Sequence, residues 1–115
     1  MEDRKIYSRD KLLTMMDQNE DEVNELMKLF IQFAPTMIAD LREAMEDEDW
    51  SKVAETAHKL KSSMRLWDMH TLDDDVVFIE THAHAKTNLD EVRQKLNALC
   101  KQLDEAIEQM RGEIV

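Results

Sequence analysis

The sequence predicts an all-α protein: an antiparallel up-and-down four-helix bundle with a short additional N-terminal helix. Three observations lead to this fold class. Apolar residues recur at spacings of three and four along most of the 115 residues, as one face of a helix requires. The chain has one glycine and one proline, so it holds little material for turns. The predicted long helices are joined by short connections, which favour antiparallel neighbours.

A single domain is expected over residues 1–115, because this length and a hydrophobic content of 43% suit one buried core. Residues 1–19 form a lead-in with a short helix near Ser8 to Met16, and residues 20–111 form the bundle. Asn19 and Glu22 have the spacing of a capping box, so the first bundle helix should begin near Glu20. Pro35 lies inside that helix and should bend it.

The first bundle helix carries more apolar residues than one packing seam needs, namely Leu29, Ile31, Phe33 and Ile38 beyond the main stripe. We expect the N-terminal segment to cover this extra apolar edge. A docking surface for a partner is the alternative.

The other three helices each follow a polar residue that can accept hydrogen bonds from free backbone amides. Their apolar positions again repeat at helical spacing. The expected starts are Asp49 before a helix over 50–67, Thr71 with Asp74 before a helix that includes Ala83, and Asn88 with Glu91 before a helix that runs to Gly112.

The net charge of −11 argues against binding to nucleic acid or to an anionic membrane face. The N-terminus lacks the apolar stretch of a signal peptide, and no apolar run approaches the length that spans a bilayer. The single cysteine, Cys100, cannot form an internal disulfide, which fits a reducing compartment. We therefore expect a cytoplasmic protein, and we expect it to be a monomer.

One histidine on the second bundle helix, His58, should face solvent. The apolar seam of that helix consists of Val53, Ala57, Leu60, Met64 and Trp67, and its centre lies well over 90° around the helix axis from His58. Residues at helical spacing from His58, which we expect on the same outward surface, are Ala54, Lys61, Ser62 and Arg65.

The segment around His58 is positive in a very acidic chain. Residues 50–67 hold four cations and one carboxylate, a net of +3 that leaves −14 for the remainder. A phosphoryl group would be attracted there, Lys61 or Arg65 could donate hydrogen bonds to it, and a neutral imidazole could attack phosphorus. The alternative is an ordinary surface histidine among solvated lysines.

The stretch His58-Lys59-Leu60-Lys61-Ser62-Ser63, with Asp49, Val53 and Ala57 before it and Leu72 and Glu80 after it, resembles the histidine-containing phosphotransfer (Hpt) domain family. The family motif is commonly written His-x-Leu-Lys-Gly-Ser, and the resemblance covers roughly Leu26 to Met110. Two departures are Ser62, where glycine is usual, and Trp67, where a second glycine often ends the helix.

The resemblance implies a phosphorelay role without autonomous kinase activity. His58 would accept a phosphoryl group from a receiver-domain aspartate and pass it to another receiver, while Lys61 steadies the phosphate. The implied partners are receiver domains of a hybrid histidine kinase and of a response regulator, and the partner supplies Mg²⁺. We expect them to dock on Ala54, Lys59, Ser62 and Arg65. Other hypotheses are a scaffold bundle in which His58 is incidental, and a histidine-kinase dimerisation domain, which is a two-helix hairpin per chain and needs a glycine-rich ATP-binding domain.

The remaining candidate sites are weaker. His82 and His84 are two residues apart, which places them on different sides of a helix, and His70 falls in a turn, so we expect no metal site. Cys100 lies among leucines and should face the core. The acidic clusters at 46–49 and 73–75 lack the order of a calcium loop and are expected to be caps and solvated surface.

Overall fold

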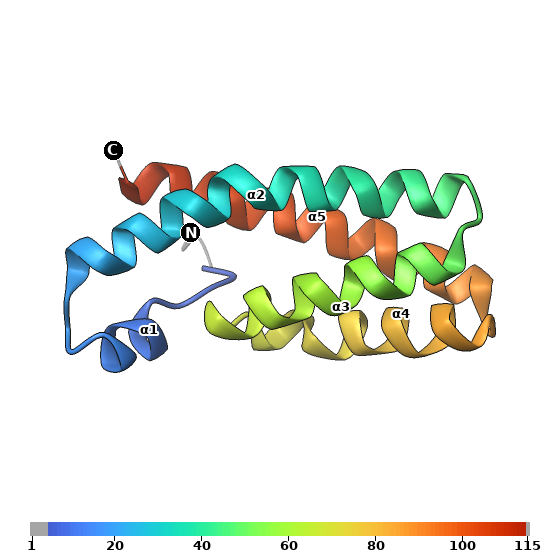
Figure 1. The fold of residues 1–115 in the computed structure, drawn as a ribbon, viewed down its shortest axis with the longest axis horizontal. Coiled ribbons are helices and arrows are strands. Elements are labelled where there is room, and N and C mark those ends of the chain that lie inside the picture. The colour runs from blue at the N-terminus through green and yellow to red at the C-terminus, as the bar shows by residue number, and fades with distance from the viewer. Residues whose placement is uncertain (1–4, 115) are drawn as a thin grey trace.

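The computed structural model describes residues 5–114, and it confirms the predicted helical bundle with a short helix before it (Figure 1). Residues 1–4 of the predicted lead-in lie outside the described residues. The elements in chain order are α1 (Asp10–Met15), α2 (Glu20–Glu46), α3 (Trp50–Leu66), the 3₁₀ turn η1 (His70–Leu72), α4 (Asp73–Ala85) and α5 (Leu89–Ile114).

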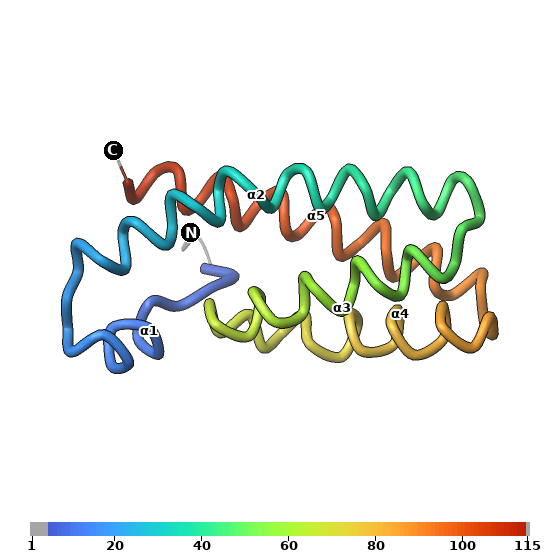
Figure 2. Tube along the Cα trace, viewed as in Figure 1, coloured from blue at the N-terminus to red at the C-terminus, as the bar shows by residue number. Residues whose placement is uncertain are grey.

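The four long helices form a closed ring of neighbours. α2 packs on α3, α3 on α4, α4 on α5, and α5 returns to α2, with α3 and α4 in the most extensive contact. At 1.5 Å per residue, α2 and α5 are each about 40 Å long, while α3 is about 26 Å and α4 about 20 Å. α2 and α5 therefore extend beyond α3 and α4 at one end, and residues 5–15 lie beside this overhang (Figures 1 and 2).

The core runs along the whole bundle, and the seam predicted for α3 is buried. Val53, Ala57 and Leu60 are fully buried, and Met64 and Trp67 are nearly so. α5 contributes Val92, Leu96, Leu99, Cys100, Leu103, Ala106, Ile107 and Met110. The predicted end of the last helix at Gly112 is wrong, because α5 continues to Ile114.

Two helix starts match their predicted caps. The Asn19 side chain accepts a hydrogen bond from the Glu22 amide at 3.1 Å, and α2 begins at Glu20. The Asp49 side chain accepts from the Lys52 amide at 3.2 Å. Pro35 lies inside α2, which is inclined over its N-terminal part and runs straight afterwards without a break (Figure 1).

The predicted start of α4 is wrong. Thr71 does not cap it: residues 70–72 form the 3₁₀ turn, and α4 begins at Asp73 with no side-chain hydrogen bond at its N-cap, Leu72. Asp73 instead forms an ion pair with Arg65 of α3. α4 thus follows directly from the 3₁₀ turn, and its first residue is used in a contact with α3.

Trp67 does not disturb the end of α3. Its backbone stays at φ −90°, and the next residue, Asp68, takes the left-handed conformation at φ 53° that a glycine would otherwise provide. Asp is among the residues that tolerate this conformation best. The indole is buried, with the Tyr7 ring edge-on at 6.3 Å and the Phe30 ring at 6.2 Å.

The expectation that the N-terminal segment covers the apolar edge of α2 is wrong for two of its residues. Leu29 remains 46% exposed and Phe33 58% exposed, while Ile38 belongs to the core. Leu29 and Phe33 line a hollow of about 220 Å³ between α1, α2 and α3, and its other lining residues include Leu12, Met37, Leu66 and Trp67. We call this hollow the apolar groove.

Candidate functional site around His58

His58 lies on the surface of α3, as predicted, because the buried seam of the helix points the other way. Its side chain is 63% exposed, whereas the flanking Ala57 and Leu60 are fully buried. The imidazole is therefore held on a rigid, well-packed helix while its ring stays open to a partner.

Glu80 of α4 holds the His58 ring. Its Oε2 atom lies 2.7 Å from His58 Nδ1, and its Oε1 atom lies 2.5 Å from Lys61 Nζ. The same carboxylate thus binds both residues of the predicted site. Glu80 is 25% exposed, so water screens these contacts less than it would on an open surface.

The environment of Glu80 determines which imidazole nitrogen carries the proton. Burial raises the pKa of its carboxyl, but the hydrogen bonds and charges of Lys61 and His58 outweigh burial and leave the pKa below its usual value. An ionised carboxylate can only accept hydrogen bonds, so His58 Nδ1 must be the donor. In a neutral imidazole, Nε2 then keeps its lone pair and is the nucleophilic atom.

Lys61 was expected on the exposed surface, and this expectation is wrong. Its side chain is 17% exposed, and its ammonium group is paired with Glu80 rather than directed freely into solvent. The aliphatic stem is covered by the bundle, as long cationic side chains often are. Lys61 consequently contributes to the packing of α3 on α4 as well as to the charge beside His58.

The other predicted docking residues differ in accessibility. Ser62 is exposed, and Lys59 is 63% exposed with its ammonium 3.5 Å from Glu55. Arg65 is 52% exposed and donates to both carboxylate oxygens of Asp73, at 2.8 and 3.1 Å.

Ala54 was expected on the outward surface but is only 7% exposed. It does lie beside the histidine: Ala54, Ser51, Glu55, Glu80 and His84 line a small open hollow against His58. A small side chain there leaves the space next to the ring unfilled.

The positive charge predicted for the segment 50–67 is largely compensated in the fold. Glu80 pairs with Lys61, Asp73 with Arg65, and Glu55 with Lys59. Two of these carboxylates come from α4, so counting charges along one helix overestimated the local field.

Sequence reasoning named Glu80 only as part of the family resemblance and expected Asp73 to be a cap or solvated surface, so the contacts of both with α3 were missed. The sequence does hold a spacing that could have indicated these contacts. His58 and Arg65 are seven residues apart on α3, and Asp73 and Glu80 are seven residues apart on α4. Seven residues are two helical turns, so on antiparallel helices the two pairs come into register. We define the His58 face as His58, Lys61, Ser62, Arg65 and Glu80.

The remaining candidates lie apart from the His58 face. Cys100 is fully buried, as predicted, and burial raises the pKa of its thiol from 9 to about 11. His82 Nδ1 lies 2.7 Å from Thr87 Oγ1, and its ring lies against Phe78. The His70 side chain is 78% exposed. Among residues 5–114, no three His, Cys, Asp or Glu side chains are grouped so that they could hold a metal ion.

Within residues 5–114, no helix combines the length and the apolar character needed to cross a bilayer.

Comparison with known proteins identifies the class. The family profile of the Hpt domain matches residues 25–113, which is most of the chain. Among solved structures, the fold is similar to the HPT domain from the Hpt sensor hybrid histidine kinase from Shewanella, with a TM-score of 0.83 and 17% identity over 97% of this chain and 96% of that one. No curated protein matches this chain by comparison.

The chain therefore belongs to the Hpt domain family. Membership implies histidine phosphotransfer in phosphorelays, in which Hpt domains work with receiver domains and act as intermediates without kinase activity of their own. The predicted family and the predicted fold class are confirmed.

Proposed function

We propose that this protein accepts a phosphoryl group on His58 Nε2 from the aspartyl phosphate of one receiver domain and passes it to the aspartate of another. The observation that carries the proposal is the hydrogen bond from His58 Nδ1 to Glu80 Oε2, at 2.7 Å, on a ring that is 63% exposed. This contact leaves Nε2 as the free nucleophile on the accessible side chain.

The proposed transfer needs no further reactant from this chain. A bond forms between Nε2 and phosphorus, the bond between phosphorus and the aspartate oxygen breaks, and the aspartate leaves as a carboxylate. The proton on Nδ1 stays in place, so the phosphorylated ring carries a positive charge. Glu80 stabilises that charge, and reversal of the same steps delivers the group to a second receiver.

Mg²⁺ for this reaction would come from the acidic pocket of the receiver domain. The ammonium group of Lys61, which is 2.5 Å from Glu80 Oε1, is one helical turn from His58 and can swing to the phosphoryl oxygens once they arrive. Lys61 would then exchange one anionic partner for another. Its proposed role is to stabilise the phosphorylated state.

The receiver domain is proposed to dock across α3. On one side of this helix lies the His58 face, and on the other side lies the apolar groove, to which α3 contributes Ser63 and Leu66. Leu66 is 41% exposed and Phe33 is 58% exposed, so docking there would remove apolar surface from water. The groove would supply affinity, and the His58 face would supply the chemistry.

The test mixes the purified protein with a panel of phosphorylated receiver domains and Mg²⁺, and measures acid-labile phosphate on the protein. We expect label on the wild type and on His70→Gln, a control that alters another exposed histidine. His58→Gln should take up none. Label on His58→Gln would overturn the site assignment, and no label on the wild type from any receiver would favour the scaffold hypothesis.

A further inference from the structure

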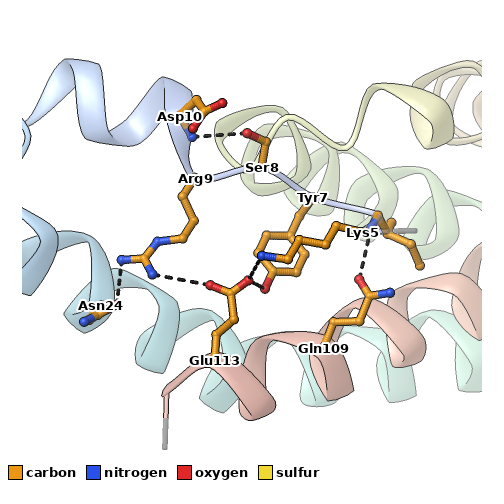
Figure 3. A network of polar contacts seen from close by, with 9 residues as sticks. Lys5, Tyr7, Ser8, Arg9, Asp10, Asn24, Gln109 and Glu113 are labelled. Atoms are coloured by element: carbon orange, nitrogen blue, oxygen red, sulfur yellow. Dashed lines mark hydrogen bonds and ion pairs between the residues drawn. The ribbon is translucent and has the colours of Figure 1, made fainter. Parts of the chain in front are cut away.

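The segment before α1 is fastened to the end of α5 through one carboxylate. Glu113 accepts from Lys5 Nζ at 2.5 Å, from the Tyr7 hydroxyl, and from Arg9 Nη1 at 3.3 Å (Figure 3). We call Lys5, Tyr7, Arg9 and Glu113 the clasp. Burial raises the pKa of the Glu113 carboxyl, but its three donors outweigh burial and leave the pKa lowered, so the carboxylate is ionised at neutral pH.

The clasp extends to the neighbouring helices. Arg9 Nη2 donates to Asn24 Oδ1 of α2 at 2.7 Å (Figure 3). The Ile6 amide donates to Gln109 Oε1 of α5 at 3.0 Å. Residues 5–9 are thus held across the end of the bundle where α2 and α5 extend beyond the other two helices.

The same segment is also attached to the end of α3. The Ser8 amide donates to the Trp67 carbonyl at 2.8 Å, and the Tyr7 ring packs edge-on against the Trp67 indole. Lys11 Nζ donates to the Arg65 carbonyl at 3.2 Å. Trp67 therefore provides the surface on which the N-terminal segment rests, which explains a large residue at this position.

α1 depends on these contacts for its place. It has six residues, far fewer than an isolated helix needs to be stable in water. Its residue Leu12 is 2% exposed and lines the apolar groove together with Phe33 and Leu66. If residues 5–9 came loose, this wall of the groove would be lost.

We infer that the clasp is a positioning device: by holding residues 5–9, Glu113 places α1 as one wall of the apolar groove and so sets how well a receiver domain docks beside His58. The docking part of this inference rests on the proposed function. The donors to Glu113 are Lys5, Tyr7 and Arg9, whereas His58 and Lys61 contact Glu80, so the effect of Glu113 would fall on docking and not on the chemical step.

The decisive variant is Glu113→Gln, which keeps the size of the side chain and removes the charge that Lys5 and Arg9 share. The matched control is Glu108→Gln, because Glu108 is also on α5 and pairs with its neighbour Arg111 on the exposed surface. Tyr7→Phe is a milder variant, since it removes one donor and leaves the ring on Trp67.

The first readout is native-state amide hydrogen exchange, which does not depend on any partner. Glu113→Gln should speed exchange at the amides of Ser8, Leu13 and Met16 by about tenfold or more, while amides in the middle of α3 keep the wild-type rate. Tyr7→Phe should give a smaller increase, and Glu108→Gln none. Unchanged exchange in Glu113→Gln would overturn the clasp.

The second readout is single-turnover transfer from increasing concentrations of a phosphorylated receiver. In Glu113→Gln the half-saturating concentration should rise several-fold while the limiting rate stays at the wild-type value. A lower limiting rate with unchanged half-saturation would overturn the docking role. If the wild type takes up no phosphate, the proposed function fails and the docking role fails with it, but hydrogen exchange still decides the clasp.

Discussion

Replacing Glu80 with glutamine tests the arrangement at the centre of the site. The amide oxygen can still accept from His58 Nδ1, so the ring should keep its position, but the negative charge beside it is lost. Phosphorylation makes the ring positive. The variant should therefore lose stabilisation of the phosphorylated ring and of the transition state that leads to it.

The size of the effect follows from the contact. A hydrogen bond to a charged group contributes about 1.5–3 kcal/mol and one between neutral groups about 0.5–1.5 kcal/mol, so the substitution removes on the order of 1–1.5 kcal/mol. This range corresponds to a rate reduction of about five- to thirteenfold. Since the His58 side chain is 63% exposed, water takes over part of the role of the carboxylate, and we expect the lower end of that range.

The assay combines quenched time courses of phosphoryl transfer, which give the transfer rate, with nitrogen-15 NMR spectra of the imidazole, which report its tautomer. In the wild type, the spectra should show the proton on Nδ1 of His58 in the neutral ring. Glu80→Gln should raise the fraction of the other tautomer and slow transfer. Glu55→Gln is the matched control, because Glu55 lines the same hollow but pairs with Lys59.

Two results would refute this reasoning. One is a Glu80→Gln protein that transfers phosphate at the wild-type rate. The other is a wild-type ring whose neutral form carries its proton on Nε2, because that nitrogen could then not attack phosphorus.

Three further predictions concern the fold. Leu60→Ala, at a fully buried position of α3, should lower the free energy of unfolding by about 2–5 kcal/mol, measured by urea denaturation, and a loss below 1 kcal/mol would mean that the core can collapse around the gap. Lys86→Gly should raise it by about 1 kcal/mol, because Lys86 has a left-handed backbone at φ 58° that glycine adopts without strain; a destabilised variant would contradict this. The free energy of unfolding should fall as the pH drops below about 4.5, because the pKa values of Glu80 and Glu113 are lowered in the folded protein and the unfolded chain then binds protons that the folded one does not. Urea midpoints at pH 7, 4 and 3 measure this loss. Equal midpoints at the three pH values would contradict the prediction.

The sequence was sufficient for the parts of the fold that depend on local pattern. Helical spacing of apolar residues gave the bundle, and side-chain oxygens at Asn19 and Asp49 gave two helix starts, because a cap acts within three residues of itself. The prediction failed at Thr71, where the chain first forms a 3₁₀ turn and Asp73 binds a residue of another helix. The spacing of Thr71 and Asp74 does not distinguish a 3₁₀ turn from the first turn of an α-helix, and it carries no information on the contact with α3.

At the candidate site, too, some features followed from local pattern and others required the tertiary structure. The position of His58 on the outer surface of its helix followed from geometry within one helix. The burial of Lys61 and Ala54 could not be predicted in this way, because it depends on how closely α4 approaches α3. The pairing of Arg65 with Asp73 likewise requires the register between the two helices.

The sequence by itself determined the helical class, the buried seam, the exposed histidine and the resemblance to the Hpt family. All of these depend on the spacing of residues that are close together along the chain. Only the tertiary structure decided that Glu80 accepts from His58, that α4 neutralises the charge of α3, and that Trp67 supports the N-terminal segment on the end of the bundle. The physical reason is distance along the chain: these contacts join residues between 8 and 60 positions apart, and their partners are chosen by packing.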